Sequence, residues 1–163
     1  MTELPLSGLV TAPFPWTLPP ALVFFAGALL VSLLRGRLQA WLALAVPLVS
    51  LWGLLGLDLQ ADFQLTILEY RLDLLRVDRL SFLFGLLFHI ASLIGVLYAL
   101  HVRSTVQQVN ALIYAGGALG AVFAGDLISL FLFWELMAVG SVFLVWARRS
   151  RRSAGAGQRY LLL

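Results

Sequence analysis

Residues 127–146, LISLFLFWELMAVGSVFLVW, form an apolar run with a single charged side chain, Glu135. A helix needs about 20 mostly apolar residues to cross the hydrocarbon core of a bilayer, and this run is long enough. The rest of the chain has the same character, because 61% of its 163 residues are hydrophobic, against about 45–50% in soluble domains. A soluble fold of this size could not bury so much apolar surface, so the sequence predicts an all-α membrane protein.

Four more apolar segments precede this run and are separated from one another by charged or turn-forming residues. The five predicted spans cover residues 20–34, 38–57, 80–100, 106–124 and 127–146. The sequence ends with Arg159, Tyr160 and three leucines, which we interpret as the first turn of a sixth helix. We therefore expect a single transmembrane domain over residues 1–163, with about five transmembrane helices plus the start of a sixth.

Between the second and third predicted spans, residues 58–78 interrupt the apolar pattern with acidic and basic side chains. Apolar and polar residues alternate over residues 63–67 and again, in the opposite register, over residues 68–74. A period of two is typical of strands, so the pattern favours a short β-hairpin on the extracytoplasmic (periplasmic) surface of the membrane. An amphipathic segment lying on that surface is the alternative.

All basic residues are arginines, and most of them stand at the ends of apolar segments. Arginines follow the first, third and fifth spans, where the last group forms the Arg-rich loop 148–158, whereas the region before the first span has none. Because cytoplasmic loops are enriched in Lys and Arg, we expect this loop in the cytoplasm, and the N-terminus and segment 58–78 outside. The pattern predicts a multi-pass protein of the bacterial inner membrane, surrounded by the lipid bilayer, and argues against nucleic acid as a partner.

Glu135 is the first candidate functional residue. It lies nine residues beyond Asp126, which precedes the fifth span, and at 1.5 Å per residue this places it about 14 Å into a core about 30 Å thick. An acidic side chain at that depth costs on the order of 3 kcal/mol, and such residues usually mark ion or proton paths. We interpret Glu135 as a proton or ion translocation site; a protonated Glu that only hydrogen-bonds a neighbouring helix is the alternative.

His89 is the second candidate. It lies eleven residues beyond Asp78, which precedes the third span, and the same rise places it about 16 Å deep. Imidazole can relay protons, so His89 is a candidate proton relay. The alternative is a buried neutral histidine bonded to a backbone carbonyl or to a serine.

The fourth span carries small residues at positions four apart. Gly116 pairs with Gly120 in this way, and Gly117 pairs with Ala121. Such pairs let helix backbones approach closely inside a membrane, so we expect close helix packing here rather than a ligand-binding loop.

The sequence gives little support for an enzyme. It has no cysteine, which excludes disulfides, thiolate catalysis and Cys-ligated metals. No metal-ligand spacing, cofactor motif or nucleophile–base pair stands out, so we expect neither a metal nor a cofactor in this chain. A transporter subunit is the favoured class, and any redox centre of a redox-driven translocase would belong to another subunit.

Residues 125–137, Gly-Asp-Leu-Ile-Ser-Leu-Phe-Leu-Phe-Trp-Glu-Leu-Met, followed by Ser141, resemble the antiporter-like subunits. These are the large membrane subunits of respiratory complex I, of Mrp-type sodium/proton antiporters and of membrane-bound hydrogenases. Val-Asp-Arg-Leu-Ser at 77–81 looks like a second landmark of the family. Gln-Arg-Tyr-Leu at 158–161 and Ser-Val-Phe-Leu-Val-Trp at 141–146 resemble the branch formed by the D-type Mrp subunits. The resemblance runs from about residue 20 to the end.

The resemblance implies that Glu135 matches the essential fifth-helix glutamate of the family, which pairs with a lysine on the seventh helix. Family members contain two inverted repeats of five helices, a common transporter plan. This chain has no lysine and stops where the sixth helix begins. We expect another polypeptide to supply the remaining helices; a truncated chain or a vestigial subunit is the alternative.

The predicted function is therefore that of a subunit in a multisubunit cation/proton antiporter or proton-pumping membrane complex. Glu135 would lie in the proton or ion path. The alternative function is a structural or assembly subunit of such a complex that does not itself translocate ions. Both functions imply other membrane subunits as partners.

Overall fold

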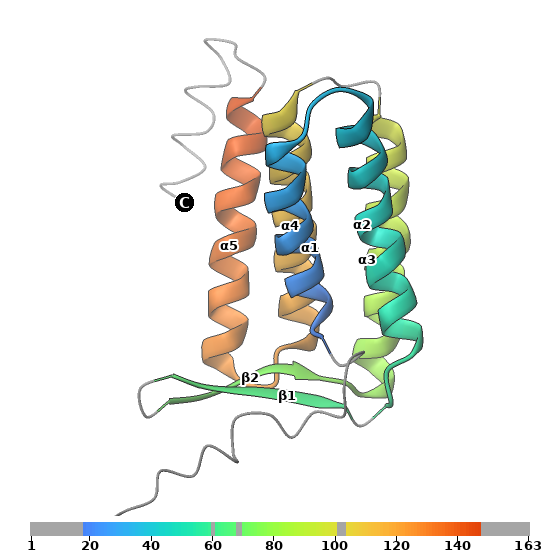
Figure 1. Cartoon of the computed structure of the whole chain (residues 1–163). Coiled ribbons are helices and arrows are strands. Elements are labelled where there is room, and N and C mark those ends of the chain that lie inside the picture. The colour runs from blue at the N-terminus through green and yellow to red at the C-terminus, as the bar shows by residue number, and fades with distance from the viewer. Residues whose placement is uncertain (1–17, 60, 68–69, 101–103, 148–163) are drawn as a thin grey trace, which may run out of the picture.

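A computed structural model describes residues 18–59, 61–67, 70–100 and 104–147 of the chain. The elements are α1 (Pro20–Leu33), α2 (Arg37–Leu55), β1 (Asp62–Ile67), β2 (Tyr70–Arg76), α3 (Arg79–Ala99), α4 (Thr105–Phe123) and α5 (Leu127–Trp146). The helices stand side by side, and the two strands lie across one end of the bundle (Figure 1). Each predicted span is a helix whose ends lie within two residues of the expected ones. The predicted start of a sixth helix and the Arg-rich loop 148–158 lie outside the described residues.

Four of these helices are long and apolar enough to cross a membrane, namely α2, α3, α4 and α5. The shorter α1 has 14 residues, which corresponds to about 21 Å at 1.5 Å per residue, against a hydrocarbon core of about 30 Å. A mostly helical, multi-pass membrane chain is thereby confirmed. The expected count of about five transmembrane helices is not confirmed for the described residues, because α1 is apolar but shorter than the other four.

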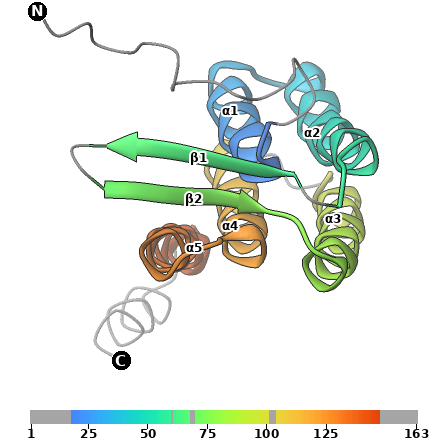
Figure 2. The same ribbon diagram turned by 90° about the horizontal axis from the view of Figure 1, so that it is seen from below.

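Four helices form a closed ring, and α5 stands outside it. α1 packs against α2, α2 against α3, α3 against α4, and α4 back against α1, as the view along the bundle shows (Figure 2). The main apolar core lies inside this ring and includes Phe24, Leu54, Leu112, Leu119 and Phe123, all fully or almost fully buried. α5 packs chiefly against α4, so one side of α5 is covered and the other is open.

Glycines allow the close approach of α4 and α5. A Cβ atom on Gly117 would lie 2.9 Å from the backbone nitrogen of Met137, and one on Gly120 would overlap the ring of Phe133. Across the same interface, a Cβ on Gly140 would lie 3.1 Å from the backbone nitrogen of Tyr114. The small residues of the fourth span therefore serve helix packing, as the sequence predicts.

The charged segment between α2 and α3 is an antiparallel hairpin of β1 and β2, with a register shift between Phe63 and Gln64. This confirms strands over an amphipathic helix. The hairpin is fastened to the turn between α4 and α5 through one residue of β2: the Asp73 N–H donates to Asp126 Oδ2 over 2.7 Å, and the Asp73 carbonyl accepts from the Gly125 N–H over 2.9 Å. The alternation in the sequence thus marks the element that closes one end of the bundle.

Asp78 and Asp126 cap the two helices that carry the candidate residues. Asp78 accepts from the Ser81 N–H at the start of α3, and the Ser81 hydroxyl accepts from the Asp78 N–H. Asp126 accepts from the N–H groups of Ile128 and Ser129 at the start of α5. Side chains that satisfy the free N–H groups of a first turn stabilise the helix end, so both helices start where the sequence predicts.

Hydrogen bonding lowers the pKa of both capping carboxyls. At Asp78 the backbone N–H of Ser81 is the largest cause and its hydroxyl the next. At Asp126 partial burial raises the pKa, but hydrogen bonds from Ser129, Asp73 and Ile128 together outweigh it and the pKa lies below its usual range. Both groups are therefore carboxylates at neutral pH and act as acceptors only.

Candidate functional site

Glu135 lies in the middle of α5, and its side chain is exposed. The buried residues of this helix, Ser129, Phe133, Gly140 and Val142, point to the rest of the chain. Glu135 belongs to the open side, together with Phe131 and Val139, which are 65% and 47% exposed. Within the part of the chain that the structure describes, no hydrogen bond or ion pair joins Glu135 to another residue.

An open carboxyl group in the middle of an apolar helix needs a partner. Among the exposed side chains beside it on α5, Phe131, Leu132 and Val139 are apolar and can neither donate to a carboxylate nor solvate its charge. The cost of placing it there is on the order of 3 kcal/mol. Within the described residues no side chain supplies a hydrogen bond or an ion pair to Glu135.

His89, unlike Glu135, is buried and hydrogen-bonded within the chain. It lies on α3 with 0% exposure, inside the ring of α1 to α4. Its Nε2 atom lies 2.8 Å from the hydroxyl oxygen of Ser50 on α2, and its Nδ1 atom lies 2.7 Å from the carbonyl oxygen of Gly85. The ring of Phe24 on α1 meets the imidazole edge to face at 5.8 Å. Both ring nitrogens are thus satisfied within the chain.

The two candidate residues do not meet. α4 packs against both α3 and α5 and lies between them (Figure 2), with His89 inside the ring and Glu135 on the far side of α5. In the part of the chain that the structure describes, the two side chains are not in contact and cannot exchange a proton directly. Any path that uses both needs intervening groups.

Ser50 is a site residue that the sequence analysis missed. The sequence offers only a weak indication, namely a polar residue within the apolar segment that forms α2. In the structure its side chain is 2% exposed. A buried hydroxyl in a membrane helix needs a partner, but which partner it finds depends on how α2 packs against α3.

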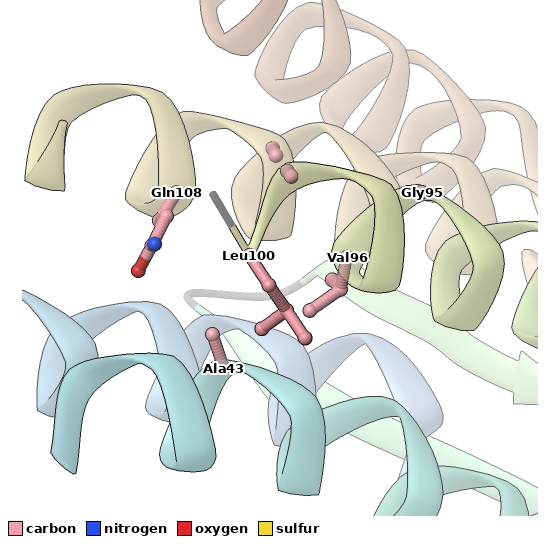
Figure 3. A pocket seen from close by; sticks show the side chains of 7 residues that line it. Ala43, Gly95, Val96, Leu100 and Gln108 are labelled. Atoms are coloured by element: carbon pink, nitrogen blue, oxygen red, sulfur yellow. The ribbon is translucent and has the colours of Figure 1, made fainter. Parts of the chain in front are cut away.

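A small cavity lies between α2, α3 and α4 and offers no substrate site. Its walls are formed by Ala43, Gly95, Val96, Ala99, Leu100, Gln108 and Ala111 (Figure 3). About 30 Å³ is open to the centre of a water molecule, which is room for a water or two. The described residues also contain no group of three His, Asp or Glu side chains that could hold a metal ion.

The chain is similar to parts of two known membrane proteins. It is 33% identical to the A-type Na(+)/H(+) antiporter subunit of Alkalihalophilus pseudofirmus over an alignment of 94 residues, which covers 53% of this chain and 12% of that protein. Its fold matches a chain of the membrane-bound sulfane sulfur reductase, an archaeal respiratory membrane complex, with a TM-score of 0.73 and 25% identity. That match covers 80% of this chain and 23% of the other. This chain therefore spans less than a quarter of either. No model of a known protein family matches the sequence.

Proposed function

Because the chain is related to the antiporter-like membrane subunits, we propose that it is a subunit of a multisubunit cation/proton antiporter or proton-pumping membrane complex. In this proposal Glu135 belongs to the proton or ion path. The observation that carries it is the position of Glu135, an exposed carboxyl in the middle of a span whose open face is otherwise apolar. A helix that only faced lipid would be more stable with an apolar residue there.

A carboxyl group at this depth responds strongly to a nearby charge. A cation brought close to a carboxyl group favours the charged form and the release of a proton. Movement of a cationic group toward and away from Glu135 would therefore load and unload a proton. His89, inside the ring, is the candidate relay of the same proposal.

The proposed assembly supplies what the open side of α5 lacks. A helix of the complex with a cationic or donor group at mid-membrane depth would cover that face and pair with Glu135. The prediction that a partner polypeptide brings this helix stays a prediction, and co-purification of the native complex tests it.

The proposed orientation of the chain in the membrane is inferred from the distribution of its arginines. Loop 148–158 would lie in the cytoplasm, and the N-terminus and the β1–β2 hairpin on the opposite side of a bacterial inner membrane. Residues 1–163 would then form one transmembrane domain, with α1 as its shortest span and the start of a sixth helix at its end. This orientation is supported by the enrichment of Arg after α1 and α5, because cytoplasmic loops are enriched in Lys and Arg.

The decisive experiment compares two carboxyl-to-amide changes in the assembled complex. Glu135→Gln is expected to reduce cation-dependent proton movement in membrane vesicles to the background of vesicles without the complex, while the subunit still assembles. Asp62→Asn, the same change at an exposed site on β1, should leave transport intact. If transport and assembly both survive Glu135→Gln, the chain is the structural or assembly subunit of the alternative function.

A further inference from the structure

Ser50, His89 and the backbone carbonyl of Pro20 form a continuous chain of hydrogen-bonding groups inside the ring. The Ser50 hydroxyl oxygen lies 2.8 Å from His89 Nε2 and 3.5 Å from the Pro20 carbonyl oxygen. On the other side of the imidazole, Nδ1 lies 2.7 Å from the Gly85 carbonyl oxygen. The groups come from three helices, α1, α2 and α3, and both side chains are at most 2% exposed.

The chemistry of these partners fixes the hydrogens of the neutral imidazole. A carbonyl oxygen can only accept, so Nδ1 carries the hydrogen and donates it to Gly85. Nε2 then has a lone pair, and the Ser50 hydroxyl donates to it. A hydroxyl has one hydrogen, so the Pro20 carbonyl receives none from Ser50 in this state.

The same groups also accommodate the imidazolium. A second proton on Nε2 is donated to the Ser50 oxygen, which has lone pairs to accept it. The hydroxyl hydrogen is then free to rotate toward the Pro20 carbonyl, which lies at the outer limit of hydrogen-bonding distance. Every N–H and O–H group keeps an acceptor in both states, and the change between them needs only the rotation of one hydroxyl.

No other charged or titratable group faces His89 from the surrounding helices. α1 contains none, α2 has only Arg37 at its first residue, and α4 has only Tyr114, which is 41% exposed. On α3 itself, Arg79 and Tyr98 stand near the two ends. A proton taken up inside the ring is therefore held by His89 alone.

We propose that His89, Ser50 and the Pro20 carbonyl form a second proton-binding site, in which Ser50 is a positioning residue that stabilises both protonation states. The inference rests on the proposed function, since a proton-translocating complex gives such a site its role, but its chemistry does not involve Glu135. One proton enters from water as the Nε2–H bond forms, and the same proton leaves when that bond breaks.

Nitrogen NMR of the full chain, labelled with 15N-histidine and reconstituted in lipid nanodiscs, tests the site. The chain has two histidines, so His101→Gln leaves His89 as the only labelled imidazole. At high pH we expect the neutral form with hydrogen on Nδ1, and at low pH the imidazolium, with the helical circular dichroism unchanged. A histidine that stays neutral down to the pH at which the helices unfold overturns the proposal.

Changes at Ser50 separate a proton site from a purely structural bridge. In Ser50→Ala an Nε2–H has no acceptor, and we expect the protonated fraction of His89 at a fixed acidic pH to fall about five-fold. Ser50→Thr keeps the hydroxyl and should restore that fraction. Equal protonation in wild type and Ser50→Ala would contradict the assignment of Ser50.

The outcome for this site is independent of the outcome for the proposed function. Glu135→Gln should leave the His89 signals unchanged while it removes transport. Loss of transport in Glu135→Gln together with a permanently neutral His89 would overturn only the second site. Transport that persists in Glu135→Gln while His89 titrates would overturn only the role of Glu135.

Discussion

α3 and α5 each carry one titratable side chain near the middle of the helix, and the two side chains differ in burial and in hydrogen bonding. His89 on α3 is fully buried, with both ring nitrogens hydrogen-bonded. Glu135 on α5 is exposed and has no partner among the described residues. The described residues thus satisfy both ring nitrogens of His89, and they leave the carboxyl group of Glu135 without a hydrogen bond or an ion pair among them.

The same comparison shows that exposure alone does not identify an interface. In the most apolar 18 residues of each helix, 11% of the residues of α3 are buried, against 22% of those of α5. α3 is therefore the more open helix. Its open face, however, is made of apolar residues such as Leu83, Leu87 and Ile94, which suit lipid. The open face of α5 includes a carboxyl group, which suits lipid poorly, so the proposed partner helix is assigned to the less exposed of the two helices.

The largest change in stability is expected where α5 meets α4. Gly117→Ala places a Cβ atom 2.9 Å from the Met137 backbone nitrogen and should destabilise the chain by about 3 kcal/mol, measured by denaturation in detergent. Gly95→Ala on α3 meets nothing within 4 Å and serves as the matched control. Equal stability of the two variants would show that α5 is not held against α4 in this register, and the outward position of Glu135 would lose its basis.

The second largest effect on stability is expected at His89, and it should contrast with the effect at Glu135. In the isolated chain, His89→Leu removes two buried hydrogen bonds and should cost about 2 kcal/mol. Glu135→Leu removes no hydrogen bond within the described residues and should not lower the free energy of unfolding, because an apolar side chain suits the open face at least as well. Thermal denaturation in the same detergent measures both. A marked loss of stability in Glu135→Leu would mean that the glutamate is already partnered within the chain.

The smallest effect is a dependence of the hairpin attachment on pH. The pKa of Asp126 is lowered in the folded chain, so its contribution to stability is complete above the pKa of the unfolded state and is lost as the pH falls through the lowered folded value. The protection of the β2 amides against hydrogen exchange, relative to their intrinsic exchange rates, should therefore fall only in strongly acidic solution. Asp126→Asn should remove this pH dependence, whereas Asp62→Asn should retain it.

The sequence is sufficient for the elements, whereas the membrane depth that it predicts for the candidate residues stays a prediction. Apolar blocks predict the helices because each block must cover itself with lipid or with another helix, and the alternation in residues 63–67 predicts a strand because successive side chains point to opposite faces. The depths of Glu135 and His89 follow from the helical rise. The first span is also the shortest of the predicted ones, at residues 20–34, and α1 ends one residue earlier still.

What the sequence could not provide is the rotation of each helix. Apart from Glu135 and two serines, α5 is apolar on all sides, so no amphipathic pattern tells which face is buried. The contacts of Gly117 and Gly120 with Met137 and Phe133 decide it. The partner of His89 was equally hidden, because Ser50 lies 39 positions away in the sequence. Their meeting depends on how α2 and α3 pack.

The most direct test of the outward-facing Glu135 uses the absence of cysteine from the chain. Phe131→Cys and Val139→Cys, one turn on either side of Glu135, and Leu87→Cys on the open face of α3 are each labelled with a photoreactive maleimide in the assembled complex in native membranes. We expect residues 131 and 139 to give discrete protein crosslinks and residue 87 to give lipid adducts alone. Lipid adducts alone at all three positions would contradict the claim that the open side of α5 is covered by a helix of the complex.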